Sequence, residues 1–128
     1  LRHVLDVRHD SFMVPEFLAL ARQYRAAVVF TDSPDYPSFA NLTTDFVYLR
    51  LMNAKSDVPT GYPPQVLASF AQCAQAWAGG GEPSGLPRVA GDTGAPASVP
   101  RDVFMFMING AKERAPAAAM GVLANLKA

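Results

Sequence analysis

Charged and polar side chains stand at the ends of several apolar segments of the sequence. Asp6, Arg8 and His9 close the first such segment, Arg50 lies near the end of a later one, and Asn109 follows the last. Two guanidinium groups can hold a phosphate or a carboxylate through paired hydrogen bonds. A histidine beside a carboxylate is a candidate general acid or base near neutral pH. These residue types point to a site for a small anionic or polyhydroxylated metabolite, with His9 and Asp6 as the candidate catalytic groups.

Two further side chains are candidates for contacts with the same ligand. Asp32, in the run Thr31-Asp32-Ser33-Pro34, is either a ligand-facing carboxylate or a turn former that bonds its own backbone. Tyr48 could hydrogen-bond in a pocket, although a buried tyrosine usually finds a partner in any case. The expected ligand-binding residues are Arg8, Arg50, Asn109, Asp32 and Tyr48.

Each candidate also has a structural interpretation. Arg8 and Arg50 could pair with an internal carboxylate such as Asp6 and tie strands together, and both interpretations need the same face of the sheet. His9 is favoured as a loop histidine bonded to backbone, because no second histidine or carboxylate stands at ligand spacing. Asn109-Gly110 could simply form a turn. We therefore expect no metal site, and the sequence leaves the cofactor unknown.

Alternating strand and helix patterns position these residues. The expected strands are residues 3–8, 26–30, 46–51 and 103–108, with helices between and after them. Short apolar strands that alternate with helices are typical of a parallel sheet covered by helices. Such folds bind ligands at the carboxyl ends of their strands, which is where the candidate residues lie.

Proline and apolar spacing mark the helices. Pro15 opens the first helix, and the second carries one apolar stripe through Val66, Phe70, Cys73 and Trp77, so that Cys73 is expected to fill the core. Pro116 opens the last helix, whose apolar stripe runs through Met120, Leu123 and Leu126.

Residues 79–100 differ sharply from the rest in composition. They hold six of the nine glycines and four of the eleven prolines. Such a segment buries little apolar surface to offset the entropy of ordering it. We expect a single β/α domain over residues 1–128 that carries a flexible insertion at 79–100.

Composition excludes several classes of protein. Eleven basic and eleven acidic side chains give a net charge of zero, so no basic excess favours nucleic-acid binding. No apolar run approaches the roughly 20 residues that span a membrane. The single cysteine fits a reducing compartment, and we expect a cytoplasmic protein. A closed eight-stranded barrel needs about 250 residues, so four strands in 128 residues would form half of one.

An ordered set of short segments, which covers nearly the whole chain outside 79–100, resembles a known family. The segments are Asp6-Val7-Arg8-His9-Asp10-Ser11-Phe12, Thr44-Asp45-Phe46-Val47-Tyr48-Leu49-Arg50-Leu51, Gly61-Tyr62 ahead of a helix with Leu67 and Trp77, and Asn109 followed by Ala115-Pro116. Together they are similar to the DUF72 (YecE-like) family. The resemblance implies a TIM-barrel-like (β/α) fold with parallel strands, and it makes this chain the C-terminal half of such a barrel.

The resemblance also implies what surrounds the chain and how its site has changed. A half barrel exposes sheet edges, so we expect either a missing N-terminal half or a homo-oligomer. The family usually has His-Gly where Met52-Asn53 stand here, and Glu in place of Asp6. Two function hypotheses follow: an enzyme-like pocket for a small metabolite, or a non-catalytic structural or binding domain with a degenerate site.

Overall fold

The computed structural model describes residues 1–108 and 110–127. Its strands are β1 (His3–Leu5), β2 (Ala26–Val28), β3 (Phe30–Thr31), β4 (Phe46–Leu51) and β5 (Asp102–Met107). All strand pairs are parallel, in the order β1-β2 in one sheet and β3-β4-β5 in the other. Only Val29 separates β2 from β3, and its N–H donates to the carbonyl of Leu5 at 2.9 Å. The strands therefore follow one continuous parallel order from β1 to β5.

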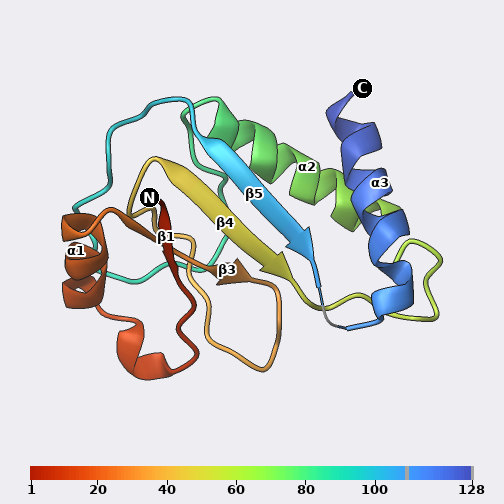
Figure 1. Cartoon of the computed structure of the whole chain (residues 1–128), viewed down its shortest axis with the longest axis horizontal. Coiled ribbons are helices and arrows are strands. Elements are labelled where there is room, and N and C mark those ends of the chain that lie inside the picture. The colour runs from red at the N-terminus through yellow and green to blue at the C-terminus, as the bar shows by residue number, and fades with distance from the viewer. Residues whose placement is uncertain (109, 128) are drawn as a thin grey trace.

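Among the described residues, three α-helices flank this sheet. They are α1 (Pro15–Gln23), α2 (Pro64–Ala78) and α3 (Ala115–Leu126), with short 3-10 helices η1 (Asp10–Phe12) and η2 (Lys112–Arg114). Figure 1 shows α1 at the β1 end of the sheet and α2 and α3 at the β5 end. Each α-helix has proline in its first turn, where the missing donor costs nothing. Among the described residues, no helix has the length and apolar character needed to cross a membrane.

The main core lies between β4 and the pair α2–α3. Leu49 and Leu51 of β4 point toward Leu67 and Trp77 of α2, and all four side chains are almost fully buried. Strand alternation places Tyr48 on the opposite face, where it is only half-buried. A smaller core beneath α1 contains Leu18, Phe39 and Val89.

The helix faces that pack against the core differ from the apolar stripes expected from the sequence. In α2 the buried residues are Leu67, Ala71, Ala74 and Trp77, whereas Cys73 is partly buried against the same core, as expected of a core filler. Burial raises the pKa of the Cys73 thiol. In α3 the core contacts come from Ala118 and Val122.

The α3 stripe is the clearest difference from the sequence prediction. Met120 and Leu123 are 69% and 54% exposed, and Leu126 is exposed as well. Ala118 and Val122 face the core because small side chains allow α3 to lie close to α2: a Cβ added at Gly121 would lie 2.6 Å from Leu67. The large apolar side chains of α3 are thereby left on the surface.

Residues 79–100 contain no helix or strand, but they contact the body of the molecule at several points. Val89 is buried in the smaller core and Leu86 packs against the main one. The backbone N–H of Ala40 donates to the carbonyl of Pro87 at 2.8 Å. The flexibility expected from composition stays a prediction, and these contacts show which parts of the segment are held.

Candidate functional site

Asp6, Arg8 and Arg50 form one ion-pair cluster, which we call the strand-end cluster. Asp6 directly follows β1, and Arg50 is the penultimate residue of β4. The Oδ2 atom of Asp6 accepts hydrogen bonds from Nη2 of Arg8 at 3.2 Å and from Nη1 of Arg50 at 3.0 Å. The side chains keep 30%, 41% and 28% of their surface exposed, respectively. Both pairings required by the structural interpretation are present, at an edge that a ligand can reach.

The charges of this cluster do not balance. Two guanidinium groups share a single carboxylate, so one positive charge is in excess. The hydrogen bond to Asp6, together with the charge of that carboxylate, raises the pKa of Arg8 above its ordinary value. The Arg8 guanidinium also lies 4.6 Å from the ring centre of Tyr36. Among the described residues, Nε of Arg50 is buried without a hydrogen-bond partner.

His9 is exposed and bonded locally. Its Nδ1 accepts the backbone N–H of Ser11 at 3.1 Å and lies 2.9 Å from the hydroxyl of Ser11. These contacts cap the start of η1, which is the loop role favoured from the sequence. No hydrogen bond joins His9 to Asp6, so the structure does not bring the two candidate catalytic groups into direct contact.

Asp32 is engaged in a second network at the carboxyl end of β4. Its Oδ1 accepts the N–H of Met52 at 2.7 Å, and its Oδ2 accepts the hydroxyl of Tyr62 at 2.6 Å. The interpretation of Asp32 as a turn former that bonds its own backbone is therefore wrong. The Tyr62 hydroxyl in turn accepts the N–H of Asn53 at 3.0 Å. Burial first, and then the neighbouring carboxylate of Asp32, raise the pKa of Tyr62.

Sequence reasoning gave Tyr62 no role, although Gly61-Tyr62 was part of the family resemblance. Gly61 has φ +75°, and a Cβ there would lie 3.0 Å from the Cβ of Ala54. That left-handed conformation favours glycine and turns the chain so that the Tyr62 ring enters the core. The Asp32–Tyr62 network holds the loop after β4, and both Asp32 oxygens are occupied in doing so.

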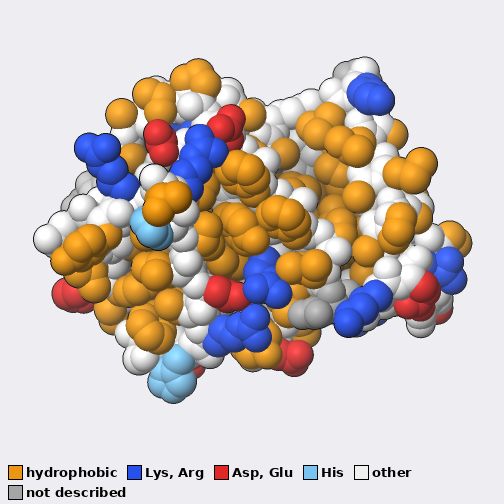
Figure 2. All heavy atoms as spheres, viewed as in Figure 1, with side chains coloured by type: hydrophobic (Ala, Val, Ile, Leu, Met, Phe, Trp, Pro, Cys, Tyr) orange, Lys and Arg blue, Asp and Glu red, His pale blue; other side chains and the backbone are white. Residues whose placement is uncertain are grey.

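Tyr48 belongs to an apolar surface beside the cluster. It lies on the same face of β4 as Arg50, with its ring centre 6.4 Å from Phe104 and 5.1 Å from Phe106. We call this face of β4 and β5 the open face. Figure 2 shows hydrophobic side chains over β4 and β5, with basic and acidic side chains together beside them. Asn109, the remaining candidate, lies outside the described residues.

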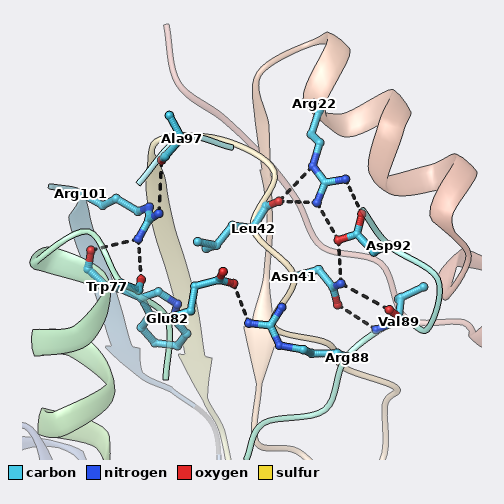
Figure 3. Close-up of polar contacts among 11 residues, drawn as sticks. Arg22, Asn41, Leu42, Trp77, Glu82, Arg88, Val89, Asp92, Ala97 and Arg101 are labelled. Carbon is cyan, nitrogen blue, oxygen red and sulfur yellow. Dashed lines mark hydrogen bonds and ion pairs between the residues drawn. The ribbon is translucent and has the colours of Figure 1, made fainter. Parts of the chain in front are cut away.

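A second polar network lies near the amino ends of the strands, and we call Arg22, Asn41 and Asp92 the loop network. Arg22 donates to both oxygens of Asp92, at 2.6 and 2.8 Å, and to the carbonyl of Leu42. Asn41 donates to Asp92 at 2.8 Å and accepts the N–H of Val89 at 2.8 Å. Figure 3 shows these side chains pointing toward one another, with Asp92 between Arg22 and Asn41.

Arg101, which lies just before β5, bonds to the segment of residues 79–100 as well. It is 6% exposed and donates to the carbonyls of Trp77, Gly81 and Ala97 (Figure 3). Among the described residues, no carboxylate pairs with it; the carbonyl dipoles at the end of α2 stabilise its charge instead. Neither Arg22 nor Arg101 was singled out from the sequence, because each has partners in residues 79–100, whose composition predicts no order.

The part of the chain that the structure describes contains no group of three His, Cys, Asp or Glu side chains able to hold a metal ion. The strand-end cluster itself consists of guanidinium and carboxylate groups. Its two guanidinium groups can donate paired hydrogen bonds to an anion's oxygen atoms, and the aromatic open face beside them can pack against the rest of a ligand.

The comparisons with known proteins agree with this architecture. A family model described as "Protein of unknown function DUF72" matches residues 1–128. This chain belongs to the DUF72 family. None of the curated proteins matches the chain significantly. The family resemblance expected from the sequence is confirmed.

Two crystal structures of a DUF72 family protein from Enterococcus faecalis V583 resemble the chain. One, at 2.52 Å resolution, has a TM-score of 0.66 at 15% identity, and the other, at 3.10 Å, has 0.65 at 13%. Each comparison covers 100% of this chain and 49% or 48% of the other. The chain thus spans about half the length of these DUF72 structures. The expected fold, part of a TIM-barrel-like (β/α) barrel with parallel strands, is confirmed, and the described strands form no closed barrel.

Proposed function

We propose that this DUF72 chain binds a small anionic metabolite at the strand-end cluster. The observation that carries the proposal is the arrangement of Arg8 and Arg50 around the single carboxylate of Asp6. Two guanidinium groups face one carboxylate, so the cluster carries a positive charge that no carboxylate within it neutralises. An anion that approaches Asp6 from the solvent side would meet two guanidinium groups already drawn together.

The position of the cluster supports the same function. Asp6 and Arg50 lie at the carboxyl ends of parallel strands, where β/α folds place their ligands. The open face next to them presents the half-buried ring of Tyr48 and the 41% exposed ring of Phe106. A ligand with an anionic group and a ring or sugar body would place the first on the guanidinium groups and the second on these aromatic side chains.

A titration of the 128-residue chain with inorganic phosphate at low ionic strength tests the proposal. Two-dimensional NMR measures the binding. We expect saturable shifts centred on the amides near Asp6 and Arg50, and at least tenfold weaker binding in Arg8→Met and Arg50→Met. Arg88→Met is the matched control. Arg88 forms an ion pair with Glu82, with 2.6 Å between Nη2 and Oε1, and neither side chain belongs to the strand-end cluster. This variant should bind phosphate as tightly as the wild type.

The second function, a structural domain with a degenerate site, is favoured by one observation. Asp6 bonds both arginines, and the Asp6–Arg50 pair links the end of β1 to β4 across the intervening strand. Under that function, Arg50→Met would lower the melting temperature markedly, and phosphate would shift no resonance near Asp6. That outcome, or equal loss of binding in the Arg88→Met control, overturns the anion site.

A further inference from the structure

Tyr36 places an aromatic ring against the strand-end cluster. Its ring centre lies 4.6 Å from the Arg8 guanidinium. Tyr36 is half-buried, whereas the Arg8 side chain is 41% exposed and lies in the loop after β1. An exposed arginine on a loop can change rotamer freely, and binding is weakened by each side chain that the ligand must immobilise. Contact with an aromatic face attracts a guanidinium and favours one orientation of its plane.

The loop after β3 holds Tyr36 in this position. Its base is closed by Oγ of Ser38, which accepts the N–H of Thr31 at 2.9 Å. Inside the loop, Oγ1 of Thr31 accepts the N–H of Ser33 at 3.1 Å, and Oγ of Ser33 accepts the N–H of Asp35 at 3.2 Å. Hydroxyl groups that bond the backbone two residues on form tight turns. The ring of Tyr36 is therefore carried by a loop with its own internal bonding.

The same loop is bonded to the strand that carries Arg50. The carboxylate of Asp32 accepts the N–H of Met52, two residues after Arg50, at 2.7 Å. In the strand register, Thr31 stands beside Arg50. One loop thus connects the end of β4, where Arg50 lies, with the ring that contacts Arg8. It helps to set the positions of both guanidinium groups of the cluster.

We propose that Tyr36 is a positioning residue of the anion site and makes that site selective for oxyanions. The role rests on the proposed function, since it assumes that the cluster binds an anion. The hydrogen bond from Arg8 to Asp6 uses Nη2, which leaves other N–H groups of the same guanidinium for a ligand. When the plane of the guanidinium is fixed, these groups can donate paired bonds to two oxygens of one anion. A spherical anion such as chloride offers no such pair and gains little from a fixed plane.

Titrations of Tyr36→Leu with phosphate and with sodium chloride, followed by two-dimensional NMR, test this role. Leucine keeps an apolar side chain but removes the ring. Phosphate binding should weaken by about fivefold, which is the expected effect of losing one cation–π contact. Chloride binding, measured on the same amides, should change by less than about twofold, because it does not use paired bonds. Tyr36→Phe keeps the ring and should bind phosphate within about twofold of the wild type.

Two further variants complete the experiment. Tyr24→Leu is the matched control, because it makes the same substitution at a 68% exposed tyrosine outside the cluster, and it should bind both anions as the wild type does. Ser38→Ala loosens the base of the loop and leaves the ring of Tyr36 in place. It should weaken phosphate binding and leave chloride binding unchanged, and it decides the question if circular dichroism shows that Tyr36→Leu is unfolded.

The possible results separate this role from the proposed function. Unchanged phosphate binding in Tyr36→Leu, or equal weakening of phosphate and chloride binding, would overturn the role of Tyr36 and leave the anion site in place. Weak phosphate binding in Tyr36→Phe would overturn the role of the ring. A wild-type chain that binds no phosphate would overturn the proposed function and the role of Tyr36 together.

Discussion

The strand-end cluster and the loop network are built from the same kinds of side chain but differ in burial and in balance. In the loop network, Asp92 accepts from Arg22, Asn41 and the N–H of Gly94, and its side chain is 9% exposed. In the strand-end cluster, Asp6 is 30% exposed and faces two guanidinium groups. The first arrangement satisfies its carboxylate completely, whereas the second leaves donor capacity in contact with solvent.

This difference separates a structural role from a binding role. Buried ion pairs are costly to break because the remaining partner stays desolvated. Half-exposed ion pairs contribute little to stability, because water screens them and rehydrates whatever remains. The loop network should therefore determine how firmly residues 79–100 are held, and the strand-end cluster should determine which ligands bind.

The largest expected effect comes from Arg22→Met. The substitution leaves the Asp92 carboxylate buried without its cation and releases the middle of the 79–100 segment. Removing one partner of a buried pair costs about 3 kcal/mol of unfolding free energy. Urea denaturation measures the loss, and Arg88→Met, which breaks an exposed pair, should cost less than about 0.5 kcal/mol. Equal losses in the two variants would contradict the structural role of the loop network.

The loop network should also determine how the protein responds to acid. The hydrogen bonds from Arg22 hold the pKa of Asp92 below its ordinary value of 3.8. Because the unfolded chain binds this proton more readily, the stabilisation is complete above about pH 4 and is lost as the pH falls further. In Asp92→Asn the stability should be lower near neutral pH and should fall less steeply below pH 4. Urea midpoints across pH 2 to 6 measure this, and an unchanged slope would exclude Asp92 as the source.

A smaller effect is expected from Arg50→Met. Its pair with Asp6 is 28% and 30% exposed, so its loss should cost at most about 1 kcal/mol of unfolding free energy. The melting temperature should change far less than in Arg22→Met. A loss as large as that of Arg22→Met would mean that the strand-end cluster holds the sheet together, as the structural function requires.

Short-range patterns predicted much of this molecule. The alternation of β4 correctly separated Leu49 and Leu51 from Tyr48 and Arg50, because side chains of a strand point to alternate faces. The first strand is shorter than expected and ends at Leu5, so Asp6 and Arg8 lie in the loop after it. Their pairing was one of the two alternatives that residue types and spacing left open.

Long-range partners could not be predicted in the same way. Arg22 and Asp92 are 70 positions apart, and nothing local marks either as a partner of the other. Asp32 and Tyr62 likewise meet only because the loop after β4 folds back. The α3 stripe misled for a related reason, since small side chains at Ala118 and Gly121 allow a closer approach than Met120 or Leu123 would.

The phosphate affinity of Asp6→Asn tests the central claim most directly. Asparagine keeps the shape and an acceptor oxygen of Asp6 but removes the negative charge between Arg8 and Arg50. If the cluster is an anion site, Asp6→Asn should bind phosphate more tightly, by about 1 kcal/mol or roughly fivefold, with little change in stability. Unchanged or weaker phosphate binding, together with a large loss of stability, would contradict the account and leave Asp6 as a structural carboxylate.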